Sequence, residues 1–217
     1  MQAATPRIAS CDVTSPGVQP CIAPSFWLLS PVFFGATATA ADMLGIRTSK
    51  DLPYGDHQRQ RLDIYSPSVV GSETPIIVFF HGGAWSSGDK AALSSQGESF
   101  AGAGVIFVAA NYRLFPDVAF PDFVYDAAAA VAFTLNSFNR EGAESRPLFV
   151  SGWSAGAYNA ALLAYDHRYL AEYKVAPGAV TGVIGLSGPY EGGYCSGIRC
   201  EHIFQRTFAA TGRFREK

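Results

Sequence analysis

A serine between two glycines, Ser154 in residues 152–156 (GWSAG), is the residue with the clearest chemical potential. The segment follows a short apolar stretch and precedes an alanine-rich one, the strand-to-helix setting of a nucleophile elbow. The glycines allow a sharp turn, and the following helix N-terminus favours developing negative charge. We therefore predict that Ser154 is a catalytic nucleophile; the alternative is an incidental serine in a glycine-rich turn.

A second motif, HGGAW at residues 81–85, directly follows an apolar stretch. Two adjacent glycines, Gly82 and Gly83, let backbone N–H groups point into a site and stabilise an oxyanion. The N–H of Ala155, next to the nucleophile, is expected to complete this oxyanion hole. His81 stands on the oxyanion side, so we expect it to brace the loop rather than to act as a general base.

Other kinds of site are not favoured. Residues 83–88 have the glycine spacing of a phosphate-binding loop, but Asp89 stands where that motif needs Lys, and its carboxylate repels phosphate. A net charge of −2, from 16 basic and 18 acidic side chains, gives no field to recruit nucleic acid. The cysteines lack the spacing and histidine partners of a zinc site, so no metal site is expected from them. They form two local pairs, either ordinary thiols or, in an exported protein, one disulfide in each end segment: Cys11/Cys21 and Cys195/Cys200.

The elements that must position these motifs alternate between strands and helices. With 217 residues, 48% hydrophobic and 16% charged, the chain suits one domain with a sizeable core. Alternation predicts an α/β fold, with a mostly parallel sheet and flanking helices, and ligands at the carboxyl ends of the strands. The expected strands are 61–65, 75–80, 105–110, 148–151 and 180–187, and the expected helices are 90–103, 121–136 and 154–169.

The N-terminal segment, residues 1–50, is expected to be either irregular or a targeting segment. Residues 26–35 (FWLLSPVFFG) are apolar, and 38–40 (ATA) resemble a signal-peptidase site. The long preceding stretch carries only Arg7 as a basic residue, and Pro31 interrupts the apolar run, so a simple signal peptide or membrane span fits poorly. A cytoplasmic location is favoured over export.

The motifs together resemble the α/β-hydrolase superfamily, in the branch of hormone-sensitive-lipase-like and feruloyl-esterase-like carboxylesterases. The resemblance covers about residues 53–190 and rests on the order and spacing of Tyr54-Gly55, RLDIY at 61–65, HGGAW at 81–85, NYRLFP at 111–116, Phe120-Pro121 with Asp126, GWSAGAYNAA at 152–161 and GLSGPY at 185–190. It implies a serine hydrolase that cleaves a small-molecule carboxylic ester through an acyl-enzyme on Ser154, without a cofactor. Trp153 departs from the family, where most members carry His, and little effect on the chemistry is expected. Arg113 and Asp126 are expected to form a structural ion pair.

The catalytic acid and histidine of the family are missing from their expected places. In relatives they follow two further strands, whereas here the likeness stops after Tyr190, and the tail 191–217 diverges. We therefore expect a fold that lacks the last two strand–helix units, with a truncated or frame-shifted gene product as the hypothesis. His202 is the candidate general base, with a surface histidine as the alternative, because His57 precedes the sheet and His167 lies about 20 Å along the helix from the serine.

Three functional interpretations stay open. The first is a carboxylesterase, with weak activity in this chain because the base and the acid are absent from their places. The second is an arylformamidase-like amidase, which shares both motifs. The third is a non-catalytic remnant that at most binds ligands. In each case the domain spans 51–190, and its last strand, 180–187, is expected to leave an apolar sheet edge that favours self-association.

Overall fold

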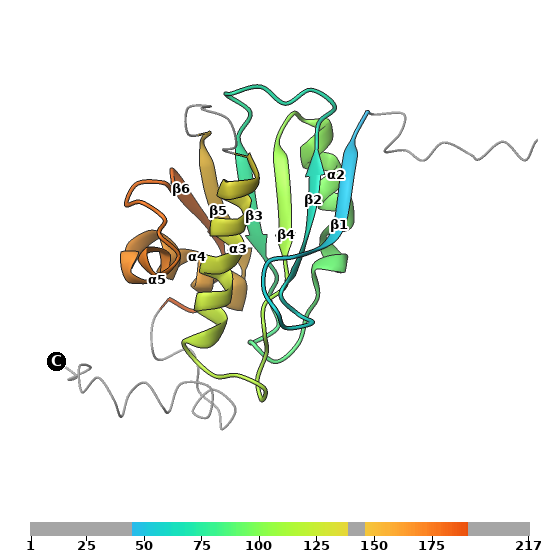
Figure 1. Cartoon of the computed structure of the whole chain (residues 1–217). Helices are drawn as coiled ribbons and strands as arrows, with labels where there is room; N and C mark the ends of the chain where they lie inside the picture. Colours follow the sequence, from blue (N-terminus) through green and yellow to red (C-terminus); the bar gives the residue numbers. More distant parts are fainter. Residues whose placement is uncertain (1–44, 139–145, 191–217) are drawn as a thin grey trace, which may run out of the picture. The chain divides into compact units, whose positions relative to one another are not determined.

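The computed structural model describes residues 45–138 and 146–190 (Figure 1). The expectations for the apolar stretch 26–35, the four cysteines, His202 and the tail 191–217 lie outside these residues.

A six-stranded, mostly parallel sheet forms the centre of the described domain, as predicted, with the strand order β1-β2-β4-β3-β5-β6 (Figure 1). The last four strands in this order pair in parallel, whereas β1 and β2 are antiparallel to their neighbours. The strands are β1 (Arg47–Pro53), β2 (Arg61–Ser66), β3 (Ile76–Phe80), β4 (Ile106–Ala110), β5 (Leu148–Trp153) and β6 (Gly182–Leu186). The parallel strands bring the segments that follow β3 and β5 to one edge of the sheet, where both motifs lie.

The two faces of the sheet are covered by different helices (Figure 1). Ile76, Val78 and Phe80 of β3 lie in the larger core, together with buried residues of α3 (Asp122–Phe138), α4 (Ala155–Tyr165) and α5 (His167–Glu172). Side chains alternate along a strand, so the intervening β3 residues Ile77 and Phe79 face the smaller core beside α2 (Ser94–Gly102).

Two predicted helices are each divided. The predicted helix 90–103 begins as a short 3-10 helix, η1 (Lys90–Leu93), whose start is capped by the Asp89 carboxylate through the N–H of Ala91; α2 follows from Ser94 without a side-chain cap. The predicted helix 154–169 stops at Tyr165, and α5 then starts anew. Asp166 between them has extended backbone, and its carboxylate caps α5 through the N–H of Arg168.

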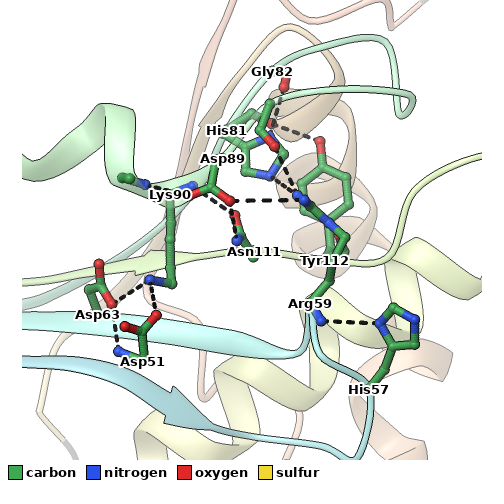
Figure 2. Close-up of polar contacts among 12 residues, drawn as sticks. Asp51, His57, Arg59, Asp63, His81, Gly82, Asp89, Lys90, Asn111 and Tyr112 are labelled. Carbon is green, nitrogen blue, oxygen red and sulfur yellow. Dashed lines mark hydrogen bonds and ion pairs between the residues drawn. The ribbon is translucent and has the colours of Figure 1, made fainter.

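Strand β1 was not predicted, and it begins before the expected domain boundary at residue 51. Its residues are mostly exposed and carry no apolar alternation, so the pattern held no sign of a strand. A buried lysine ties β1 to the domain: Lys90 Nζ lies 2.7 Å from carboxylate oxygens of both Asp51 and Asp63 (Figure 2).

Within residues 45–138 and 146–190, no helix is both long and apolar enough to cross a membrane. The same residues include no group of three or more His, Cys, Asp or Glu side chains placed to hold a metal ion.

Candidate active site

Ser154 lies at a sharp turn between β5 and α4. Its backbone has φ 52° and ψ −116°, a conformation that an L residue rarely adopts and that costs about 1–3 kcal/mol. The N–H of Ser154 donates to the carbonyl of Leu186 in β6 at 2.8 Å, and its own carbonyl accepts from the N–H of Tyr158 at 3.2 Å. Strand and helix thus hold the strained residue from both sides.

The two flanking glycines are required by close backbone approach. A Cβ on Gly152 would overlap the backbone of Gly156, and a Cβ on Gly156 would overlap the carbonyl oxygen of Phe80. The first turn of α4 therefore packs directly against the ends of β5 and β3. This contact places the helix N-terminus behind the serine, as a nucleophile elbow requires.

The glycine loop after β3 approaches the same serine. A Cβ built on Gly82 would lie 3.3 Å from the Cβ of Ser154 and 3.0 Å from the carbonyl oxygen of Trp153. Gly83 has φ 120°, and its carbonyl accepts from the N–H groups of Ser86 and Ser87 at 3.0 and 3.1 Å. The structure thus brings the loop of Gly82 and Gly83 against the serine and its successor Ala155.

His81 braces this loop, as expected. Its imidazole is buried, stacks on Tyr112 with ring centroids 4.5 Å apart, and places Nδ1 2.7 Å from the carbonyl oxygen of Gly82. Burial is the main cause that lowers the pKa of His81, and the nearby Arg59 guanidinium lowers it further. Because Nε2 faces Arg59 at 3.3 Å, this ring nitrogen is not directed at a substrate (Figure 2).

Trp85, the last residue of the HGGAW motif, anchors the loop to the helices. Its indole N–H donates to Oδ1 of Asn159 in α4 at 3.0 Å, and its ring stacks on Phe123 of α3 at 5.4 Å. Sequence reasoning gave Trp85 and Asn159 no role, although both lie within the quoted motifs. A hydrogen-bonding pair 74 residues apart carries no local pattern.

Arg113 and Asp126 form the expected ion pair below the site. Arg113 donates to both carboxylate oxygens, with the shortest distance 2.7 Å, and its backbone N–H donates to the same carboxylate at 2.9 Å. Asp126 is 1% exposed and also accepts from Nε2 of Gln60 at 2.8 Å. The pair joins the segment after β4 to α3 and to the turn before β2.

Trp153, which precedes the nucleophile, is 58% exposed. Its ring lies against Gly82, where a Cβ would come 3.2 Å from the ring edge. The indole therefore lies beside the loop of Gly82 and Gly83. The expectation that it has little effect on the chemistry stays a prediction.

A general base is not assigned among residues 45–138 and 146–190. No histidine ring in these ranges hydrogen-bonds to the Ser154 hydroxyl. His57 accepts from the N–H of Arg59 at 3.1 Å, and His167 is exposed at the start of α5, beyond the far end of α4. His202, the candidate from the sequence, lies outside the described residues.

A hollow of about 400 Å³ runs along α4 and β6. Its lining is largely apolar and aromatic: Tyr158, Ala161, Leu162, Tyr165, Val183, Gly185 and Tyr190. Tyr158 lies one helical turn after the serine, so one end of the hollow begins near the elbow.

This strand order, with a glycine-flanked serine between β5 and α4, is typical of an α/β-hydrolase. The BD-FAE family model matches residues 62–192, which is more than half of the chain. The chain belongs to the BD-FAE family.

Relatives and solved structures agree with this family. Isoprenylcysteine alpha-carbonyl methylesterase ICME of Arabidopsis thaliana is 34% identical over 145 residues, 65% of this chain and 34% of that protein. Kynurenine formamidase of Danio rerio is 28% identical over 67% of this chain and 47% of its own length. The chain thus spans less than half of either relative. Esterase B from Lactobacillus rhamnosis shares the fold, with a TM-score of 0.59 and 18% identity over 77% of this chain and 58% of that one.

Proposed function

We propose that this protein is a serine hydrolase that cleaves carboxylic esters through an acyl-enzyme on Ser154. The observation that carries the proposal is the strained turn of Ser154, with φ 52°, set against Gly82 at the carboxyl edge of the sheet. A turn of this kind presents the hydroxyl at the edge where α/β proteins bind ligands. The likeness to a plant methylesterase supports ester chemistry.

Each residue of the site is assigned a role in the acylation reaction. The Ser154 oxygen attacks the ester carbonyl carbon, and the carbonyl oxygen gains negative charge. The N–H groups of Gly82, Gly83 and Ala155 stabilise that charge, and the N-terminus of α4 adds its dipole. Collapse of the intermediate expels the alcohol and leaves the acyl group on Ser154, which water then releases.

The proton steps need a base that takes the hydroxyl proton and returns it to the leaving alcohol. His81 is buried between Arg59 and the Gly82 carbonyl, so we assign it no proton transfer. Residues 45–138 and 146–190 offer no base for these steps; acylation without one is slow, with about 10³–10⁴-fold catalysis over water from the oxyanion hole and binding. We therefore expect this chain to hydrolyse p-nitrophenyl acetate barely above background.

A formamide substrate is the second candidate. The chain is 28% identical to a kynurenine formamidase over 67% of its length, and the same serine and oxyanion loop serve both acyl transfers. Ester and aryl-formamide substrates therefore belong in one assay panel, in which the faster acylating class identifies the preferred bond.

Acylation of the enzyme in excess over p-nitrophenyl acetate tests the proposal. We expect intact-mass measurement to reveal one acetyl group, which peptide mapping assigns to Ser154 and which Ser154→Ala abolishes. An acetyl group that persists in Ser154→Ala contradicts the proposal. Ser187→Ala is a matched control, because Ser187 also has positive φ, 53°, but lies after β6 rather than before α4.

A further inference from the structure

Arg59 lies in the turn before β2, yet its guanidinium reaches the loop that follows β3 (Figure 2). Its Nε donates to the carbonyl of Tyr112 at 2.9 Å, and its Nη2 donates to the carbonyl of Gly88 at 2.9 Å. The same Nη2 lies 3.3 Å from Nε2 of His81, and Nη1 lies 3.9 Å from a carboxylate oxygen of Asp89. One side chain thus joins three segments at the carboxyl edge of the sheet.

These contacts bind both ends of the loop at residues 81–88, which carries Gly82 and Gly83 and which we call the oxyanion loop. His81 begins the loop and Gly88 ends it, and a Cβ on Gly88 would overlap both the Gly82 carbonyl oxygen and the His81 ring. The Tyr112 hydroxyl donates to the His81 carbonyl at 2.8 Å. Arg59 therefore binds a loop whose two ends are already in contact with each other.

The hydrogen bonds of His81 fix its tautomer. The Gly82 carbonyl oxygen can only accept, so the ring proton lies on Nδ1, 2.7 Å away. Nε2 then carries the lone pair and accepts from the Arg59 guanidinium. The Gly82 carbonyl and Arg59 thus favour the same tautomer, and loss of the Arg59 donor removes one of the contacts that select the Nδ1–H form over the Nε2–H form.

The tautomer in turn sets the direction of one oxyanion donor. The carbonyl of Gly82 and the N–H of Gly83 belong to one planar peptide unit and point in opposite directions. When His81 Nδ1–H holds the carbonyl, the Gly83 N–H is turned away from the imidazole. A rotation of this peptide would move the N–H out of the oxyanion hole.

We propose that Arg59 is a positioning residue for the oxyanion loop, which acts through His81 and the Gly82 carbonyl to aim the Gly83 N–H. This inference rests on the proposed function, because it assigns that N–H to the oxyanion. Among the described residues, Arg59 makes polar contacts with Tyr112, His81, Gly88 and Asp89, and not with Ser154. Arg61, two residues on, is a matched control, since its Nη1 also donates to three backbone carbonyls, those of Gly55, His57 and Gln60, within the turn before β2.

The first arm of the test is nuclear magnetic resonance of the imidazole nitrogens in the full chain, with His81→Gln to assign the signals. We expect the Nδ1–H tautomer of His81 in the unmodified chain and a larger share of the Nε2–H tautomer in Arg59→Gln, which keeps the Gly82 contact but lacks the Arg59 donor. Removal of the guanidinium should also raise the pKa of His81, because Arg59 is one of the causes that lower it. Arg61→Gln should change neither. An unchanged tautomer in Arg59→Gln overturns the inference, whether or not Ser154 proves to be the nucleophile.

The second arm is the rate at which a fluorophosphonate labels Ser154. Misplacement of a catalytic group by about 1 Å costs about a hundredfold in rate, so we expect Arg59→Gln to label about ten to a hundred times more slowly. Arg61→Gln should label at the original rate. Arg59→Lys keeps the positive charge, so its labelling rate should fall between those of the unmodified chain and Arg59→Gln; it is the second variant to measure if Arg59→Gln does not fold. Equal slowing in Arg59→Gln and Arg61→Gln, or no slowing in Arg59→Gln, overturns the inference.

Discussion

At Ser154 the chain adopts a conformation that an L residue avoids, and the surrounding residues explain how it persists. Gly152 and Gly156 let β5 and α4 meet without Cβ atoms, and Leu186 accepts the serine N–H. The sequence was sufficient to predict this turn because its determinants are adjacent. Arg59 was not predicted, because its partners lie 22 to 53 residues away and no spacing connects them.

His81 makes the stability of the domain depend on pH. Burial lowers its pKa below the ordinary 6.5, so near that pH the unfolded chain binds a proton that the folded chain does not. The free energy of unfolding should therefore fall as the pH drops from about 6.5 towards the lower folded pKa. Urea unfolding across this range measures the slope.

His81→Gln should flatten this slope, whereas His167→Gln, which changes an exposed ring at the start of α5, should preserve it. A slope that survives in His81→Gln would assign the pH dependence to other groups.

At the scale of elements, two of the central parallel strands follow from apolar runs. Strands β3 and β4 are predicted to within about one residue because their sequences are continuous apolar runs. Strand β5 extends beyond its predicted end at Ser151 to Trp153, because the polar Ser151 and Gly152 interrupt its apolar run. The division at Asp166 was missed, because periodicity does not show that its carboxylate caps a new helix. Capping is decided by one side chain, which periodicity does not detect.

Close contact between α4 and β3 makes Gly156 sensitive to substitution. Gly156→Ala should lower the free energy of unfolding by about 1–3 kcal/mol, because its methyl group would overlap the Phe80 and His81 carbonyls. Gly71→Ala, in an exposed turn with 4.0 Å to the nearest atom of Thr74, should stay within about 0.5 kcal/mol. Equal denaturation midpoints for the two variants would contradict this packing.

The buried carboxylate of Asp126 joins α3 to the segments around it. Asp126→Asn should cost about 2 kcal/mol in unfolding free energy, below the 3–5 kcal/mol of a fully buried pair, because Arg113 keeps 27% of its side chain exposed. Asp166→Asn, which changes a pair with the 84% exposed Arg168, should have little effect. Thermal unfolding measures the stability loss of both variants. A larger loss for Asp166→Asn than for Asp126→Asn would contradict this prediction.

At the scale of the whole molecule, β6 is an edge strand of the described sheet, and two of its apolar side chains are exposed to solvent. Ile184 and Leu186 are 47% and 48% exposed, and Trp153 beside them is 58% exposed. Apolar strand edges pair with other chains, so we predict self-association at concentrations on the order of tens of micromolar.

Light scattering over a concentration series measures this association. Ile184→Lys should shift the chain towards monomer, whereas Val69→Lys, at an 81% exposed position in the loop after β2, should not. A monodisperse monomer for the unmodified chain would contradict the prediction.

The identity of the nucleophile is tested most directly by a fluorophosphonate, which phosphonylates activated serines and leaves a stable adduct. After long incubation and proteolysis, mass spectrometry locates the adduct in the sequence. We predict slow labelling, with the phosphonate on Ser154 alone and no labelling of Ser154→Ala. An adduct on another residue, or equal labelling of the chain and Ser154→Ala, would show that the strained serine beside Gly82 is not the nucleophile.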